Sequence, residues 1–245
     1  LDFKSLYPSI MRTFNIDPLM FGKKGITAPN GATFSKEIGI MPQILEELWT
    51  VREEYRKKKD EVGRYAIKIL MNSFFGAMAS PLCRFYNLDL ANSITYFAEF
   101  LTKETANMIQ KEGFEVIYSD TDSCFVVVDK NPKKVGKELE KKINLLWDKK
   151  IKKEFKINSF LELEFEKVYT KFIMPKLRGS EKGAKKRYAG LVNGKLEITG
   201  LEAVRGDWTK LAQKFQKELL MKVFAEKEVG KFVSKFIKDL ESSVN

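Results

Sequence analysis

The sequence of 245 residues contains no histidine. This absence excludes a Ser-His-Asp or Cys-His nucleophile system, an imidazole general base and a histidine-based zinc site. A metal ion bound by this chain must therefore be held by carboxylates, carbonyl oxygens or the two cysteines.

Cysteines and long apolar runs are also scarce. Cys83 and Cys124 are the only cysteines, and two such residues build no disulfide framework, which favours a reducing, intracellular setting. No run of about 18 apolar residues occurs, so we expect no transmembrane helix and no membrane partner. Because the first residue is Leu1 rather than Met, we expect a processed or incomplete piece of something longer.

Positive charge is concentrated in one quarter of the chain. Lys and Arg total 44 against 33 Asp and Glu, a formal net charge of +11. Residues 131–190 carry 18 basic and 8 acidic groups, whereas residues 1–130 carry 16 and 17. Such a local basic field attracts polyanions such as nucleic acid, and a lysine-coated helical face that only keeps the protein in solution would give the same count.

Hydrophobic periodicity predicts an α+β fold with an antiparallel sheet backed by helices. Leu1–Phe3 is extended and leads into a short helix, and residues 15–35 are expected to form a loop. Two helices separated at Gly63 would form a projecting hairpin. Helices are expected at about 42–59, 64–79, 88–111, 132–153 and 207–240 (broken near Gly230), and strands at 114–118, 123–129, 161–169, 172–174, 187–192 and 196–198.

Two aspartates lie at the tip of a predicted β-hairpin in the segment YSDTDS, residues 118–123. Asp120 and Asp122 are two residues apart around a turn, which can bring their carboxylates together. Converging carboxylates repel each other unless a divalent cation lies between them, and hard oxygen ligands favour Mg²⁺ or Mn²⁺. A polar hairpin tip without a metal has the same composition, because Asp and Thr are common turn residues.

Another aspartate, Asp2, ends an apolar extended segment just before a predicted helix start. Backbone N–H groups at a helix start can hold phosphate oxygens, and Tyr7, followed by Pro8, places a flat ring near the same point. An N-cap aspartate with a core tyrosine is the alternative interpretation.

Basic residues recur at helical spacing on both helices of the predicted hairpin. Arg52 and Arg56 are four residues apart, and Lys68, Asn72 and Phe75 share one face of the next helix. Two basic faces could bind a triphosphate, or could be solvated stripes.

Five segments in order resemble the motifs of family B DNA polymerases over essentially the whole chain. They are LDFKSLYPSI (1–10), KILMNSFFG (68–76), YSDTDS (118–123), KKRYAG (185–190) and TGLEAVRGDW (199–208). Residues 83–95 and 172–191 are similar to the bacterial DNA polymerase II branch of that family. Two departures are Phe75, where the family usually has Tyr, and Ser119, where it usually has Gly.

The resemblance implies a division into polymerase subdomains. Residues 1–41 and 81–204 would form the palm, residues 42–80 a helical-hairpin fingers subdomain, and residues 205–245 the start of the thumb. The proofreading exonuclease of the family precedes the first motif, so we expect it to be absent here. A separate exonuclease portion and a sliding clamp are candidate partners, and the expected location is the nucleoid in the cytoplasm.

The resemblance also implies template-directed DNA synthesis by two-metal nucleotidyl transfer of a dNTP to a primer 3′-hydroxyl. The expected ligands of two Mg²⁺ ions, for which Mn²⁺ may substitute, are Asp2, the Phe3 carbonyl, Asp122 and Asp120. The expected nucleotide-binding residues are Ser5, Leu6, Tyr7, Arg52, Arg56, Lys68 and Asn72. The expected contacts to primer–template DNA are Phe75, Thr121, Lys185, Lys186, Arg187, Tyr188 and Arg205.

Two other functions stay open at this point. A reverse-transcriptase-like palm enzyme also has paired aspartates on a hairpin, but the bulky Tyr7 favours deoxynucleotides. A non-catalytic or partner-dependent DNA-binding fragment of a split or truncated polymerase is the other alternative, against which the intact Asp2 and Asp122 argue. Three glutamates that alternate along a predicted strand could support the site or line a solvated face; they are Glu162, Glu164 and Glu166.

Overall fold

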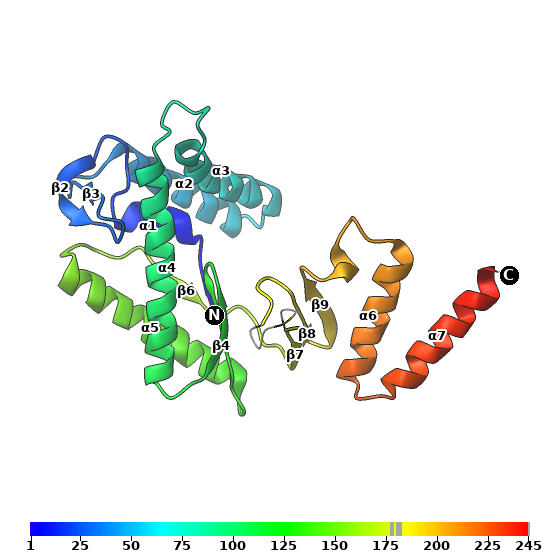
Figure 1. Cartoon of the computed structure of the whole chain (residues 1–245). Coiled ribbons are helices and arrows are strands. Elements are labelled where there is room, and N and C mark those ends of the chain that lie inside the picture. The colour runs from blue at the N-terminus through cyan, green and yellow to red at the C-terminus, as the bar shows by residue number, and fades with distance from the viewer. Residues whose placement is uncertain (177–178, 180–182, 245) are drawn as a thin grey trace. The chain divides into compact units, whose positions relative to one another are not determined.

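The computed structural model describes residues 1–176, 179 and 183–244 (Figure 1). Its contacts divide the chain into two compact units, Leu1–Glu166 and Lys167–Asn245. Helices and antiparallel strands are mixed in the chain, so the predicted α+β class is confirmed. None of the helices in the described part is long and apolar enough to span a membrane.

The first unit is built on a four-stranded antiparallel sheet with the strand order β4-β5-β1-β6. These strands are β1 (Asp2–Phe3), β4 (Val116–Asp120), β5 (Ser123–Val126) and β6 (Leu163–Glu164). Phe3 pairs with Leu163 across β1 and β6, and both side chains are buried. One face of the sheet is therefore apolar and needs a cover.

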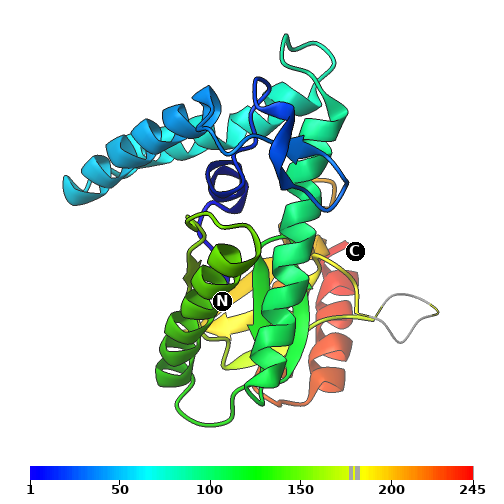
Figure 2. The same ribbon diagram turned by 90° about the vertical axis from the view of Figure 1, so that its left-hand side faces the viewer.

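Two long helices cover this apolar face, as Figure 2 shows: α4 (Leu88–Lys111) and α5 (Pro132–Glu154). Their inward residues share one core with Phe3. Trp147 of α5 is fully buried, and its Nε1 donates a hydrogen bond of 2.9 Å to the hydroxyl of Thr105 on α4. The two helices are thus fixed to each other as well as to the sheet.

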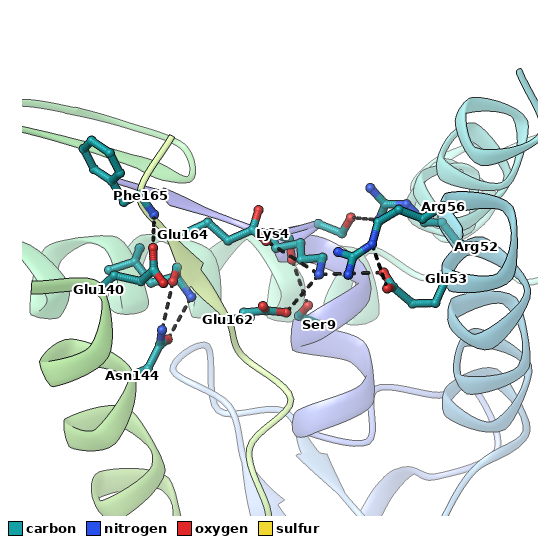
Figure 3. Close-up of polar contacts among 12 residues, drawn as sticks. Lys4, Ser9, Arg52, Glu53, Arg56, Glu140, Asn144, Glu162, Glu164 and Phe165 are labelled. Atoms are coloured by element: carbon teal, nitrogen blue, oxygen red, sulfur yellow. Dashed lines mark hydrogen bonds and ion pairs between the residues drawn. The ribbon is translucent and has the colours of Figure 1, made fainter. Parts of the chain in front are cut away.

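The outer edge of β6 is satisfied by side chains of α5 rather than by another strand (Figure 3). Asn144 accepts from the Leu163 N–H and donates to its carbonyl, both at 2.8 Å, and Glu140 accepts from the Phe165 N–H at 2.6 Å. These contacts take the place of the backbone hydrogen bonds that another strand would make. They therefore leave this edge less available for pairing with another chain. Only two residues of the predicted strand 161–169 pair as a strand, because the partner strand β1 spans only Asp2–Phe3.

Three more helices stand beside the sheet: α1 (Leu6–Thr13), α2 (Ile40–Lys57) and α3 (Glu61–Ala79). The last two form the predicted hairpin, and Figure 2 shows them extending away from the sheet. The expected break at Gly63 is wrong, because Asp60 caps α3 by accepting from the Gly63 N–H at 2.8 Å. This N-cap places Gly63 inside the first helical turn.

Residues 15–35 are not a loop throughout, contrary to the prediction. They contain an antiparallel pair, β2 (Phe21–Thr27) and β3 (Thr33–Phe34), with an irregular register. Ile26 and Phe34 are buried in the main core. The glycines and lysines of this short pair interrupt the alternation that would have revealed it.

The second unit joins a three-stranded antiparallel sheet to helices. Its strands are β7 (Lys171–Ile173), β8 (Tyr188–Val192) and β9 (Lys195–Thr199); its helices are η1 (Glu202–Val204), α6 (Lys210–Phe224) and α7 (Val229–Val244). Ala189, Leu201, Leu220 and Phe224 form its small core. The final helices separate at residues 225–228, so the predicted break at Gly230 is slightly misplaced.

Candidate active site

Acidic side chains form a row across one face of the first sheet. Asp2 lies opposite Ser123 on β5 and Glu164 on β6, and Ser123 lies opposite Asp120 on β4. Residues directly opposite each other in an antiparallel pair point to the same face, about 5 Å apart. Asp120 and Asp2, two strands apart, are therefore separated by about 10 Å. The row faces away from α4 and α5, because the neighbouring Phe3 faces toward them.

The hairpin tip brings Asp122 beside Asp2. The Phe3 N–H donates to the Asp122 carbonyl at 2.8 Å. Thr121 adopts the left-handed conformation, with φ at 45°, and its carbonyl accepts a 2.7 Å hydrogen bond from the Thr102 hydroxyl of α4. The α4 side chain therefore holds the backbone of the turn, which fixes the position of Asp122.

Burial and neighbouring carboxylates raise the pKa of Asp2 from 3.8 to about 7. Burial is the largest cause, and the charges of Asp122, Glu166 and Glu164 act in the same direction. A bound cation would relieve this repulsion, and carboxylate oxygens suit Mg²⁺ or Mn²⁺. Within the described residues, no group of three or more acidic or cysteine side chains is arranged as a ready metal site. Asp2 and Asp122 thus fit as a pair of ligands, not as a closed cage.

The start of α1 lies next to these carboxylates. Ser5, in the left-handed region with φ at 47°, precedes the first helical residue, Leu6. The Ser5 hydroxyl accepts a 2.7 Å hydrogen bond from Nη1 of Arg52 on α2. Burial, together with the nearby Arg64 of α3, lowers the pKa of Arg52. A helix N-terminus and guanidinium groups from two helices thus form a positive region suited to phosphate.

Tyr7 contacts the second helix of the hairpin. Its ring lies 4.9 Å from the ring of Phe75 on α3, centroid to centroid, at an interplanar angle of 57°. Both residues pack against the main core without being fully buried. The first and second sequence motifs are therefore in direct contact.

The other predicted nucleotide-binding residues lie along the same hairpin. Arg56 is exposed on α2, and its Nε lies 3.2 Å from the Glu53 carboxylate. Lys68 and Asn72 are exposed on α3 at the spacing of one helical turn. Their side chains are available to a ligand.

The predicted DNA-binding residues of the second unit precede and begin β8. Lys185 and Lys186 are exposed in a turn, and the ring of Tyr188 packs with Phe172 at 5.5 Å. Arg187 forms an ion pair with Glu202. The backbone of Lys186 passes close to Gly200, where an added Cβ would overlap the Lys186 carbonyl oxygen.

Arg205 follows η1 and is also part of an ion pair. It forms a two-pronged ion pair with Asp207, at 3.0 and 2.6 Å. Both side chains are exposed, so water and salt weaken this pair. Arg205 could still exchange Asp207 for a phosphate.

Several residues near Asp2 and the start of α1 were not predicted from the sequence. The ring of Trp49 on α2 is approached by three cations: Lys4 at 5.5 Å, Arg12 at 5.0 Å and Arg52 at 5.8 Å. Arg12 also lies 4.3 Å from the ring of Phe160. The only sequence signal was the position of Trp49 one turn before Arg52 on the same helix.

Comparison with known proteins then assigns the family. The model of DNA polymerase family B matches residues 1–245. The chain belongs to DNA polymerase family B. It is 38% identical to DNA polymerase II of Escherichia coli over 98% of this chain and 33% of that protein. It is 33% identical to the DNA polymerase of Archaeoglobus fulgidus over 98% of this chain and 30% of that protein.

The fold agrees with this assignment. The solved structure of the family B DNA polymerase from Pyrobaculum calidifontis matches 99% of this chain with a TM-score of 0.65 at 26% identity. The resemblance to the bacterial polymerase II branch is also confirmed. This family B chain spans about a third of the length of the relatives that it matches.

Proposed function

We propose that this chain carries out template-directed DNA synthesis, transferring a dNTP to the 3′-hydroxyl of a primer. The observation that carries the proposal is the position of Asp2 and Asp122 side by side, next to the start of α1 and to Arg52. Carboxylates for metal ions and cations for a triphosphate are the two parts that phosphoryl transfer needs.

The proposed subdomains follow the elements of the fold. Residues 1–41 and 81–204 act as the palm, residues 42–80 as the fingers and residues 205–245 as the start of the thumb. The sheet and its row of acids support the palm assignment, and the α2–α3 hairpin supports the fingers assignment.

Two Mg²⁺ ions, or Mn²⁺ in their place, are proposed to bind Asp2, Asp122 and the Phe3 carbonyl, with Asp120 as an additional ligand. When bound, they would lower the pKa of the primer 3′-hydroxyl and neutralise the pyrophosphate. The protein holds Asp2 and Asp122 close despite their repulsion, since the β1–β5 pairing fixes both backbones. The groups that would stabilise the transition state are therefore in position before the reaction begins.

The triphosphate is proposed to bind between the start of α1 and the hairpin. Backbone N–H groups near Ser5 and Leu6 and the side chains of Arg52, Arg56, Lys68 and Asn72 would contact the phosphate oxygens. Tyr7, backed by Phe75, would lie under the sugar. Lys185, Lys186, Arg187, Tyr188, Thr121 and Arg205 would contact the primer–template.

Primer extension tests this proposal directly. Asp2→Asn and Asp122→Asn should each abolish Mg²⁺-dependent extension while leaving duplex binding nearly intact, because only metal binding is lost. The matched control is Asp148→Asn, an exposed aspartate on α5, which should extend primers like the parent chain. Near-parental turnover in either site variant would refute the assignment.

A further inference from the structure

Lys4 is a largely buried cation that faces three carboxylates. Its side chain is 13% exposed, and its Nζ lies 3.2 Å from Glu162, 3.6 Å from Glu164 and 3.8 Å from Glu53. Figure 3 shows that two of these acids come from the β6 segment and the third from α2. One ammonium group thus joins the strand that flanks Asp2 to the first helix of the hairpin.

Glu53 is shared between two cations. Its Oε1 faces Lys4, and its Oε2 lies 3.2 Å from Nε of Arg56 (Figure 3). Trp49, about one turn earlier on α2, has Lys4 and Arg52 near its ring. Lys4 therefore contacts the side of α2 that carries both arginines.

In the described chain, the second half of α2 contains no fully buried residue. Within this helix, which the structure describes in full, the buried residues are Met41, Pro42 and Leu45, all in the first two turns. Beyond them, helix position depends on partly buried and polar contacts, which are weaker per residue than core packing. Lys4 meets α2 in this second half.

We propose that Lys4 is a positioning residue of the polymerase reaction, fixing α2 so that Arg52 and Arg56 face the triphosphate. This inference rests on the proposed function, in which these arginines bind the nucleotide. Without the Lys4 charge, Glu53 would keep its contact to Arg56 but lose the cation that ties it to the sheet. The link from α2 to the β6 segment would also be lost. A partly buried, charge-assisted contact contributes more than an exposed ion pair.

The kinetic test uses the full chain with primer–template and a single dNTP. Lys4→Met removes the charge and keeps the length, so KM for the dNTP should rise about tenfold, with a smaller change in kcat. Lys4→Arg should restore most of the affinity. The matched control, Lys103→Met, removes a lysine that pairs with Glu99 on the exposed side of α4 and should leave KM unchanged.

A double variant tests whether Glu53 carries the effect of Lys4. If Lys4 acts through Glu53, then Lys4→Met/Glu53→Gln should be no worse than the worse single variant, because both changes break one contact. Fully additive effects on KM would overturn this coupling. A lowered thermal midpoint with parental KM and kcat would reduce Lys4 to a structural residue and overturn the proposal.

Hydrogen exchange separates this inference from the proposed function. Without substrate, Lys4→Met should speed amide exchange in residues 49–57 and leave α4 at the parental rate. If the parent chain extends no primer while this change in exchange is seen, the anchoring of α2 stands and the proposed function fails. Parental exchange together with parental KM would overturn the Lys4 proposal.

Discussion

The ring of Tyr7, in the first turn of α1, packs against the ring of Phe75 on α3 with their centroids 4.9 Å apart. Two rings from residues 68 positions apart in the sequence thus lie together beside the start of α1. Tilted aromatic pairs at this separation are stabilising beyond their buried area. The contact fixes the Tyr7 ring beside the start of α1, where the proposed function places the nucleotide sugar.

Tyr7→Ala should increase ribonucleotide use. If the ring excludes a 2′-hydroxyl, its removal should lower the preference for dNTP over rNTP by on the order of a hundredfold, because a misplaced α-phosphate reacts slowly. Tyr7→Phe should change little, since bulk rather than the hydroxyl blocks the oxygen. Paired single-nucleotide insertion assays measure this, with Tyr96→Ala, an exposed tyrosine on α4, as the control. An unchanged preference in Tyr7→Ala would make Tyr7 a packing residue only.

The pKa of Asp2 predicts a pH-dependent stability. Its folded-state pKa of about 7 lies above the ordinary 3.8, so the folded chain binds more protons and loses stability as pH rises through about 4 to 7. In chelator, Asp2→Asn should therefore raise the thermal midpoint at pH 8, and by less at pH 5. Asp148→Asn should give no such pH-dependent gain. A gain from Asp2→Asn that is equal at both pH values would contradict the charge repulsion.

The basic segment 131–190 predicts salt-sensitive DNA binding, with unequal contributions from its two parts. The α5 helix covers the face of the sheet opposite the acidic row, whereas Lys185 and Lys186 are exposed just before β8. Replacing both by Gln should reduce the slope of log K against log salt by about 2. The same change at Lys137 and Lys141 of α5 should leave the slope unchanged. The reverse result would place DNA on α5.

We predict that the second unit requires glycine at position 200 for its stability. The φ of Gly200 is +62°, and a Cβ there would overlap the Lys186 carbonyl. Gly200→Ala should therefore destabilise the chain by on the order of 2 kcal/mol or more. Gly206→Ala, where a Cβ meets no atom within 4 Å, is the control in thermal or urea unfolding. Equal stability of the two variants would contradict the close approach.

Local signals predicted much of the fold. The α4 helix spans Leu88–Lys111 as expected, because Asn87 caps its start and Gly113 follows its end. The β4–β5 hairpin followed from two apolar runs around a polar turn. The β2–β3 pair was missed since its glycines and lysines hide the alternation, and short strands depend on tertiary packing.

The site was predictable only where one segment carried several of its residues. Asp2, Ser5 and Tyr7 lie in one motif, so their proximity follows from the chain itself. The Lys4–Glu162 contact joins residues 158 positions apart, and Glu53 reads as an ordinary exposed helix charge. No periodicity encodes such pairs, because they exist only once the sheet and the hairpin have formed.

Template-directed synthesis is tested most directly by single-nucleotide insertion on four primer–templates that differ only at the first templating base. Each duplex is offered each dNTP in turn with Mg²⁺, using the parent chain and Asp122→Asn. The expected result is insertion of the complementary nucleotide on each template by the parent chain and none by Asp122→Asn. Insertion that ignores the template base, or equal insertion by Asp122→Asn, would contradict the proposed polymerase function.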